Sequence, residues 1–277
     1  MSGLEGRTIL MSGGSRGIGL AIALRAAADG ANIALLAKTD TPHPRMEGTV
    51  HTAAERIREA GGNALPIVGD VRNDDDIAAA VAQTLEAFGG IDVVLNNASV
   101  IDLAGSLGLA AKKYDLMQDV NVRGTFMLSR AAVPALQEST NPHILSLSPP
   151  LNLSPKWLGA HTGYTLAKYG MTMTTLGLAA EFGEAGIAAN TLWPRTTIAT
   201  AAVQNLLGGD RIMAVSRTPQ IYADAAYAVL TTPSRQLTGQ TLIVEDVLEA
   251  AGVTDLSGYA AVPGTPDEAL FPDIFLD

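Results

Sequence analysis

The sequence predicts an α/β fold: a doubly wound, mostly parallel sheet of seven strands with helices packed on both faces. Short continuous apolar runs alternate with longer amphipathic stretches along the chain, which is typical of parallel strands joined by helices. A glycine-rich segment, "SGGSRGIG" at residues 12–19, separates the first apolar run from the first amphipathic stretch. No internal repeat or linker divides the sequence, so we expect a single domain over residues 1–277.

Each element follows from this alternation. The predicted strands are the apolar runs at residues 7–14, 31–37, 64–70, 91–97, 143–148, 187–193 and 240–246. The predicted helices are the amphipathic stretches at residues 16–28, 52–62, 73–88, 111–118, 121–136 and 163–182. In such sheets ligands bind outside the carboxyl ends of the strands, so side chains that follow strands are the first candidates for a site.

Three segments fall outside this pattern. Residues 38–51 form a long connection of unassigned role, and residues 196–220 follow the sixth strand, where they could cover a substrate as a lid. The alternative for both is an ordinary solvated loop. Residues 249–277 are predicted to be a C-terminal extension of the same domain.

The composition excludes several classes of function. A net charge of −10 gives no electrostatic attraction to nucleic acid, and no apolar run is long enough to span a membrane. The absence of cysteine excludes thiolate chemistry, and the glycine-rich segment begins within a dozen residues of the first Met, which leaves no place for a signal peptide. A cytoplasmic protein is therefore expected. The four histidines are scattered, so no metal site is predicted.

The glycine-rich segment is predicted to bind a dinucleotide. Gly13, Gly17 and Gly19 permit a tight turn and a close backbone approach, and the free N–H groups at the helix start attract a phosphate. A lone glycine pattern is weak, but here it opens the first strand–helix unit, which is the context that a Rossmann-type site requires. Ser15 and Ile18 complete the predicted phosphate loop.

The end of the second predicted strand indicates the preferred cofactor. An acidic residue there would bind the adenosine ribose hydroxyls and favour NAD. The sequence instead has Lys38, and Arg16 lies in the glycine-rich segment. These cations could hold a 2′-phosphate, which favours NADP(H). The alternative is that both are solvated surface cations.

Tyr164 and Lys168 are candidates for acid/base chemistry. Residues four apart share one face of a helix, so the ammonium of Lys168 would lie near the phenol of Tyr164. A phenol has a pKa of about 10, and a neighbouring positive charge lowers it. The alternative is an ordinary helical tyrosine whose ring packs in the core.

Six motifs occur in order, most of them at predicted strand ends: "SGGSRGIG", "GDV" (69–71), "NNAS" (96–99), "NVRG" (121–124), "YTLAK" (164–168) and "NTLWP" (190–194). The series resembles the short-chain dehydrogenase/reductase family over nearly the whole chain. A closer similarity, to hydroxysteroid dehydrogenase-like proteins, rests on "AKTDTPHP", "GTVHTAAE", "SPPLNL", "YTLAKYGM" and "FPDIFLD". Animal members of that subgroup also carry a sterol-carrier-type domain, so this chain is expected to correspond to their reductase part alone.

The resemblance implies roles for further residues. Lys168 would also bind the nicotinamide ribose, and Asn121 would hold a water that links Lys168 to solvent. The alternative for Asn121 is a helix cap or kink residue. Asp70 and Val71 would contact the adenine, and Asn97 and Ala98 would lie along the ribose. The segment with Pro194 and Ile198 would contact the carboxamide. Thr197 is the alternative to Ile198 for the carboxamide contact. The alternative for Asn97 is a residue that only stabilises a turn.

The catalytic serine that the family places a little upstream of the tyrosine has no direct counterpart. Counting back from the tyrosine reaches Leu151, and aligning the strand reaches Pro149. Ser148, at the strand end, is the preferred candidate, and Asn152 and Ser154 are the alternatives. The two prolines after Ser148 fix φ and remove two backbone donors, so a rigid loop could aim one of these side chains at a carbonyl oxygen.

Together these features predict an NADP(H)-dependent oxidoreductase that transfers hydride between the nicotinamide and a carbonyl/alcohol pair, with Tyr164 as acid/base. An apolar substrate is expected from the side chains around the predicted pocket: Leu151, Leu153, Trp157, Leu158 and Trp193. Family members often pack the helix that corresponds to residues 163–182 against a partner subunit, so the resemblance implies a homodimer or homotetramer; the alternative is a helix that faces the core. The alternatives are a cofactor-binding sensor or partner protein without turnover, and a C=C (enoyl-type) reductase on the same fold.

Overall fold

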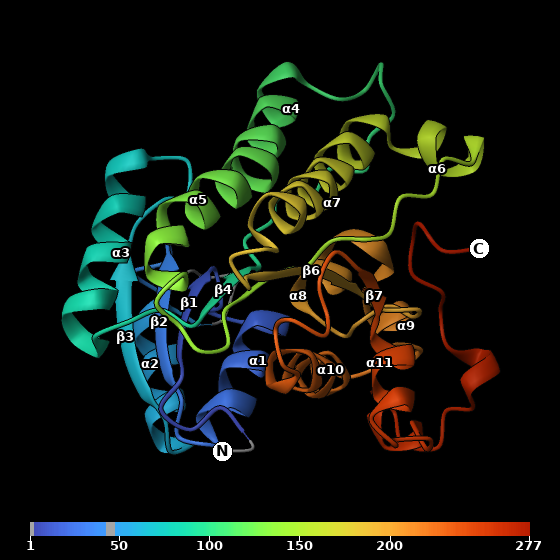
Figure 1. Cartoon of the computed structure of the whole chain (residues 1–277). Helices are drawn as coiled ribbons and strands as arrows, with labels where there is room; N and C mark the ends of the chain where they lie inside the picture. Colours follow the sequence, from blue (N-terminus) through green and yellow to red (C-terminus); the bar gives the residue numbers. More distant parts are fainter. Residues whose placement is uncertain (1–2, 43–47) are drawn as a thin grey trace.

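In the computed structural model, seven strands form one sheet in the order β3-β2-β1-β4-β5-β6-β7 (Figure 1). The structure describes residues 3–42 and 48–277. The strands are β1 (Thr8–Ser12), β2 (Asn32–Ala37), β3 (Asn63–Val68), β4 (Val93–Asn96), β5 (His143–Ser146), β6 (Ala188–Trp193) and β7 (Thr241–Ile243). Every adjacent pair is parallel, which confirms the predicted doubly wound class and extends it from mostly to wholly parallel.

Helices cover both faces of the sheet, as predicted (Figure 1). On one face pack α1 (Gly17–Ala27), α2 (Val50–Glu59), α10 (Pro219–Thr231) and α11 (Val244–Ala250). On the other face pack α3 (Asp74–Phe88), α5 (Gly124–Leu136) and α7 (Thr162–Phe182). The remaining helical pieces are α4 (Ala111–Met117), η1 (Gln118–Arg123), α6 (Pro155–Ala160), α8 (Ala201–Val203), η2 (Gln204–Gly208), α9 (Gly209–Ala214), η3 (Ser257–Tyr259) and η4 (Asp267–Ala269).

The central strand β1 shows why its apolar run is continuous. Successive side chains of a strand point to opposite faces. Ile9 and Met11 pack into the core under α1, whereas Leu10 packs into the core under α5, and all three are fully buried. A strand covered on both sides has no face left for polar residues, so its sequence lacks alternation.

Three sequence-based boundaries need correction. The helices predicted at 111–118 and 121–136 are one continuous helical run, because the π-helical turn η1 joins α4 to α5. The seventh strand is shorter than predicted: it ends at Ile243, and residues 244–250 form α11. The segment that follows the predicted lid is a full helix, α10, for which the sequence pattern predicted no element.

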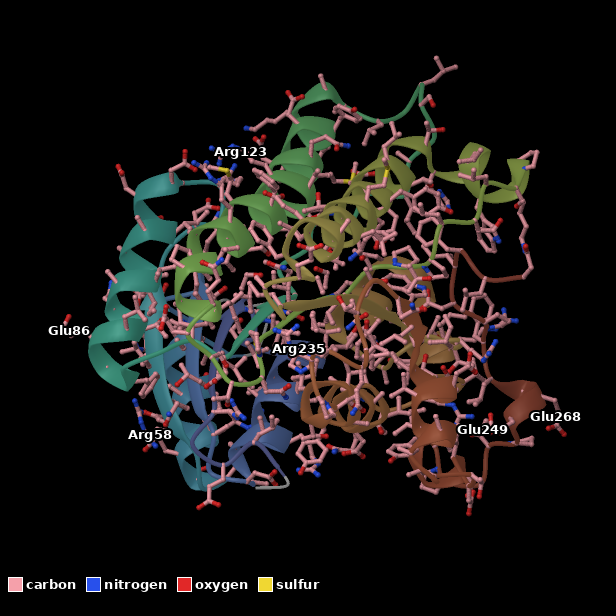
Figure 2. All side chains as sticks on the ribbon, viewed as in Figure 1. Arg58, Glu86, Arg123, Arg235, Glu249 and Glu268 are labelled. Carbon is pink, nitrogen blue, oxygen red and sulfur yellow. The ribbon has the colours of Figure 1, made fainter. Side chains whose placement is uncertain are left out.

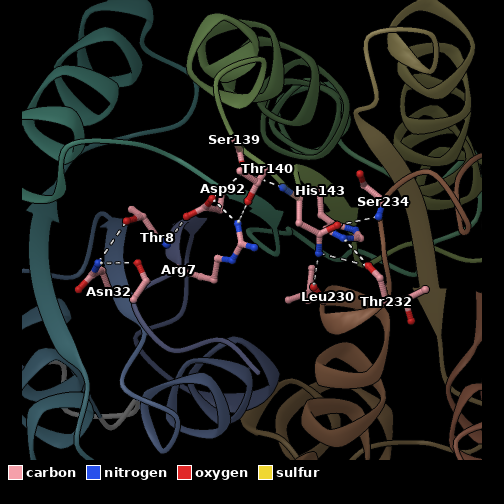
Figure 3. A network of polar contacts seen from close by, with 12 residues as sticks. Arg7, Thr8, Asn32, Asp92, Ser139, Thr140, His143, Leu230, Thr232 and Ser234 are labelled. Carbon is pink, nitrogen blue, oxygen red and sulfur yellow. Dashed lines mark hydrogen bonds and ion pairs between the residues drawn. The ribbon is translucent and has the colours of Figure 1, made fainter. Parts of the chain in front are cut away.

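The amino ends of the central strands are held by a polar network (Figure 3). The Asp92 carboxylate accepts hydrogen bonds from Arg7 at 2.9 Å, from the Thr8 N–H at 2.8 Å and from Ser139 at 2.5 Å. Nearby, Nε2 of the buried His143 lies 3.0 Å from the Thr232 carbonyl oxygen. This network fixes the end of the sheet opposite the strand ends that would carry a ligand.

Charged side chains gather at the periphery, as the labelled Arg58, Glu86, Glu249 and Glu268 illustrate in Figure 2. In the part of the chain that the structure describes, no helix is both long and apolar enough to cross a bilayer.

Candidate active site

The glycine-rich loop lies at the switch point of the sheet, between the carboxyl ends of β1 and β4. Gly13 and Gly17 have φ of 77° and 58°, a region that favours glycine. The Asn97 side chain donates to the Ser12 carbonyl at 3.0 Å, and a Cβ atom on Gly13 or Gly19 would lie 2.6 Å from Nδ2 of Asn97. The structure therefore brings together the predicted residues Gly13, Gly19 and Asn97, and only glycine allows this approach.

The start of α1 fits a phosphate group. The N-cap residue Arg16 makes no side-chain hydrogen bond to the first turn of the helix, so no cap competes for its N–H groups. Free N–H groups at the positive end of a helix dipole attract anions. The glycine-rich loop has no room for a Cβ at Gly13 or Gly19, and together with the start of α1 it fits the pyrophosphate of a dinucleotide.

Two cations flank the end of β2, as the sequence predicted. The guanidinium of Arg16 donates to Oγ1 of Thr39 at 3.2 Å, and Nζ of Lys38 lies 3.1 Å from Oδ2 of Asp70. Burial raises the pKa of Asp70, but hydrogen bonds from Arg72 and the contact with Lys38 outweigh it and hold that pKa well below its usual range. Asp70 is therefore an anion that positions Lys38. Residues 43–47 of the long connection, including His43, lie outside the described residues.

Tyr164 and Lys168 lie one turn apart on α7, and both are 4% exposed. Nζ of Lys168 donates to the Leu147 carbonyl at 2.8 Å and lies 5.3 Å from the ring centroid of Trp193. Burial lowers the pKa of Lys168 to about 7. Burial also raises the pKa of Tyr164, and the negative charge of Asp273 adds to the rise, so the lowering expected from Lys168 is not found in the protein alone.

Asn121 lies within η1, the π-helical turn between α4 and α5, and is fully buried. Its side chain accepts the N–H of Val100 at 2.7 Å and donates to the carbonyl of Val100 at 2.9 Å. The amide thus locks the loop after β4 to the helical run. Each of these two polar atoms keeps one further hydrogen-bonding position, because an amide oxygen has two lone pairs and an NH2 group has two donors.

The three candidates for the missing serine have different surroundings. Ser148 is fully buried, and its Oγ lies 3.0 Å from Oγ1 of Thr172 on α7. The Asn152 side chain is occupied, because it donates to the Phe275 carbonyl at 3.3 Å and accepts from Ser154 N–H at 3.0 Å. Oγ of Ser154 is buried and has no partner among residues 3–42 and 48–277.

The segment after β6 continues from Pro194 and packs over the glycine loop. A Cβ on Gly17 would lie 3.6 Å from Cγ2 of Thr200. Thr197 uses both backbone groups: its N–H bonds to Phe271 and its carbonyl accepts from Arg217, each at 2.9 Å. No such bond engages the backbone of Ile198 within the described parts of the chain, which favours Ile198 over Thr197 as the carboxamide contact. The predicted lid contains α8, η2 and α9.

The C-terminal residues 271–277, hereafter the C-terminal strap, were not expected at the site. In Figure 1 this segment ends beside α6. Phe275 is 1% exposed, and its ring is stacked on Tyr164 with centroids 6.1 Å apart. The available signal was the apolar "IFL" at residues 274–276, since an isolated apolar run in a polar extension indicates a packed segment.

Comparison with known proteins identifies the family. The family model for short chain dehydrogenases matches residues 7–209. The chain belongs to the short-chain dehydrogenase family. This agrees with the sequence-based resemblance and with the strand order, which is that of dinucleotide-binding sheets.

Several relatives extend the match beyond that region. Hydroxysteroid dehydrogenase-like protein 2 from Danio rerio is 53% identical over 99% of this short-chain dehydrogenase, and the human protein of the same name is 50% identical over 99%. These alignments cover 65% and 64% of the relatives, so the chain spans less than two thirds of their length. The closer similarity to this subgroup is thereby confirmed.

Solved structures agree with the fold. A short chain dehydrogenase from Mycobacterium thermoresistibile is 59% identical, with a TM-score of 0.93 over 99% of this chain and 96% of the other. A candidate dehydrogenase from Xanthomonas campestris is 54% identical, with a TM-score of 0.95 over 99% of both chains. A metagenomic short-chain oxidoreductase in complex with NADP is 26% identical, covers 87% of this chain and 97% of the other, and has a TM-score of 0.69. The family thus supports an oxidoreductase that uses a nicotinamide cofactor.

Proposed function

We propose that this short-chain dehydrogenase is NADP(H)-dependent and transfers hydride between the nicotinamide and the carbonyl or alcohol carbon of an apolar substrate. The observation that carries the proposal is the buried pair of Tyr164 and Lys168 on one face of α7. A phenol and an ammonium, one helical turn apart and shielded from water, are suited to proton transfer to a carbonyl oxygen.

The residues that would hold the cofactor surround this pair. The glycine loop and the start of α1 would bind the pyrophosphate, and Arg16 and Lys38 the 2′-phosphate. When bound, the cofactor supplies or accepts the hydride. The remaining proposed contacts lie at the ends of the strands or on α7: Ser15, Ile18, Asp70, Val71, Asn97, Ala98, Pro194, Ile198 and Lys168.

In the reduction, Tyr164 would donate its phenolic proton to the carbonyl oxygen while the carbonyl carbon gains hydride, so a ketone becomes an alcohol. Lys168 stabilises the phenolate that remains, because opposite charges attract strongly in a dry site. Proton return to Tyr164 would proceed through Lys168 and a water held by Asn121. The oxidation runs the same steps in reverse.

The apolar character of the substrate follows from the walls of the site. Trp157, Trp193 and Phe275 belong to one buried cluster with Tyr164. Aromatic walls of this kind favour apolar groups, and few polar partners remain to bind a hydrophilic substrate.

A second function, cofactor binding without turnover, is favoured by one observation. Ser148 is fully buried, and its Oγ accepts a hydrogen bond from Oγ1 of Thr172, so its hydroxyl is held in the core beside α7. Turnover that disappears in Tyr164→Phe would exclude this second function. NADPH binding without oxidation across a panel of ketones would support it.

The cofactor assignment is tested by fluorescence titration with NADPH and NADH. Loss of one charge-assisted contact weakens binding by roughly 1.5 kcal/mol, or about tenfold. Lys38→Ala should therefore raise the Kd for NADPH about tenfold and leave that for NADH unchanged. Lys112→Ala, an exposed lysine on α4, is the matched control. Equal affinity for both cofactors in the parent protein would contradict the proposed preference.

We also propose a homodimer or homotetramer built on α7. Leu166 and Met173 project from this helix with exposures of 52% and 64%, and Phe126 of α5 is also exposed. Large apolar side chains on neighbouring helices favour association. Light scattering of Met173→Glu should show a smaller species than the parent protein if α7 is the interface.

A further inference from the structure

The C-terminal strap connects the two segments that border the candidate site. On one side, the Asp273 N–H donates to the Arg195 carbonyl at 2.9 Å, and Nε1 of Trp193 donates to the Ile274 carbonyl at 3.0 Å. On the other side, Nε1 of Trp157 donates to the Asp277 carboxylate at 3.1 Å. The strap therefore runs from the segment after β6 to the segment after β5.

Phe275 is the centre of this arrangement. Its ring centroid lies 5.3 Å from that of Tyr169, 6.0 Å from Trp157, and 6.1 Å from both Tyr164 and Trp193. Aromatic pairs in this range contribute about 0.5–1.5 kcal/mol each beyond the area they bury. The ring thus occupies space directly against the proposed proton donor.

The backbone of Phe275 supports a specific role. Its φ of 75° is in a region that side chains with a Cβ rarely adopt, and it is the single such non-glycine residue among those described. A conformation of this kind costs about 1–3 kcal/mol and persists only where surrounding contacts hold it. The contacts of the strap hold it here, and strain of this type clusters at functional sites.

The same strap brings a carboxyl group toward the site. Burial raises the pKa of Asp273 to about 7, and the positive charge of Lys168 opposes that rise. Asp273 is half-buried, and its carboxylate accepts the N–H of Ile274 at 2.7 Å. The strap thus contributes both an aromatic ring and a carboxyl group to the surroundings of Tyr164 and Lys168.

We infer that residues 273–277 of the C-terminal strap are part of the substrate site and that Phe275 determines specificity by limiting the size of the group that can lie against Tyr164. The inference rests on the proposed function for its kinetic readout. The space filled by the Phe275 ring is that of a phenyl group, so removing the ring should admit a substrate that carries one more phenyl group.

The experiment compares acetophenone with 4-acetylbiphenyl, which share the reacting carbonyl and differ by one phenyl ring. Phe275→Gly removes the ring and also suits the positive φ, so it avoids the backbone strain that Phe275→Ala would retain. Phe271→Ala is the matched control, because that phenylalanine belongs to the same strap but is 46% exposed.

With NADPH, Phe275→Gly should raise the ratio of kcat/KM for 4-acetylbiphenyl over acetophenone by about tenfold or more. Phe271→Ala should leave the ratio within about twofold of the parent value. An unchanged ratio in a folded Phe275→Gly protein, or an equal shift in Phe271→Ala, would overturn the inference. Phe275→Leu, which keeps an apolar side chain of smaller size, serves if the glycine variant does not fold, and should shift the ratio in the same direction.

A binding readout separates this inference from the proposed function. The two tryptophans of the chain, Trp157 and Trp193, both pack against Phe275, so their fluorescence reports on the surroundings of this ring. If the parent protein reduces neither ketone, the proposed function fails, but quenching by 4-acetylbiphenyl still measures binding. About tenfold tighter binding in Phe275→Gly than in the parent protein would support the inference, and equal binding would overturn it.

Discussion

Replacing Gly19 by alanine should destabilise the protein and weaken its cofactor site at the same time. Gly19 lies in the first turn of α1, and its φ is not positive, so backbone strain does not enter. A Cβ there would lie 2.6, 2.8 and 2.9 Å from Nδ2, Cγ and Oδ1 of Asn97. Distances below 3.0 Å force the Asn97 side chain to move, and the move breaks its 3.0 Å hydrogen bond to the Ser12 carbonyl.

The expected magnitude is a balance of three contributions. Alanine gains at most about 1 kcal/mol of helix propensity over glycine. Overpacking costs about 1–3 kcal/mol, and the lost hydrogen bond about 0.5–1.5 kcal/mol. The net destabilisation is therefore about 0.5–3.5 kcal/mol, which lowers Tm by roughly 1–6 °C for a chain of this size. NADPH binding should also weaken, since Asn97 is a proposed ribose contact.

Gly177→Ala is the matched control for this experiment. Gly177 lies inside α7, and no heavy atom of the described residues beyond its own turn lies within 4 Å of the point that a Cβ would occupy. The same change should therefore stabilise the protein by about 1 kcal/mol and raise Tm by about 2 °C. Differential scanning calorimetry measures both variants. A rise in Tm for Gly19→Ala with unchanged NADPH affinity would refute the steric reasoning.

Further predictions concern pH and the proposed polarising residue. Burial lowers the pKa of His143 to about 4, so the folded state binds fewer protons than the unfolded state between that value and about 6.5, and stability is lost as the pH falls through this window. Urea unfolding at pH 6.5 and pH 5 should show a loss of about 1.5 kcal/mol from this residue, absent in His143→Gln; an identical loss in that variant would contradict the assignment. Ser148→Ala should lower kcat/KM by about 10²–10³ without changing the Kd for NADPH, as steady-state kinetics would show. Undiminished activity would return the role to Ser154.

Much of the fold could be predicted because its strands are buried on both faces. A continuous apolar run such as residues 31–37 indicates a buried parallel strand when predicted helices precede and follow it. The prediction of the seventh strand was wrong beyond Ile243, because the pattern of a short apolar run does not distinguish a strand from a helix. Glu245 and Asp246 in the first turn of α11 were the missed signal, since acidic side chains favour a helix start. Likewise Pro219 at the start of α10 was a helix signal that went unused.

The candidate site also has parts that the sequence predicts and parts that it does not. Gly13, Gly19 and Asn97 could be placed together from the sequence, because parallel strands end at one edge of the sheet. The raised pKa of Tyr164 could not be predicted from the sequence. The sequence shows Lys168 as a neighbour of Tyr164 but does not show how far water is excluded from the site. Phe275 could not be placed from the sequence either, because its aromatic partners lie more than eighty residues away and no local pattern predicts its positive φ.

The position of the strap has a consequence for biosynthesis. A ribosome makes the chain from its amino end, so all seven strands and α7 emerge before Phe275 does. Until then Tyr164 lacks its stacked ring, and Trp157 and Trp193 lack their hydrogen-bond acceptors in residues 274–277. Contacts between residues so distant in sequence form late, because closing a long loop costs entropy before the contacts repay it. The sheet and the proposed dinucleotide site are therefore expected to form before the strap packs against Tyr164.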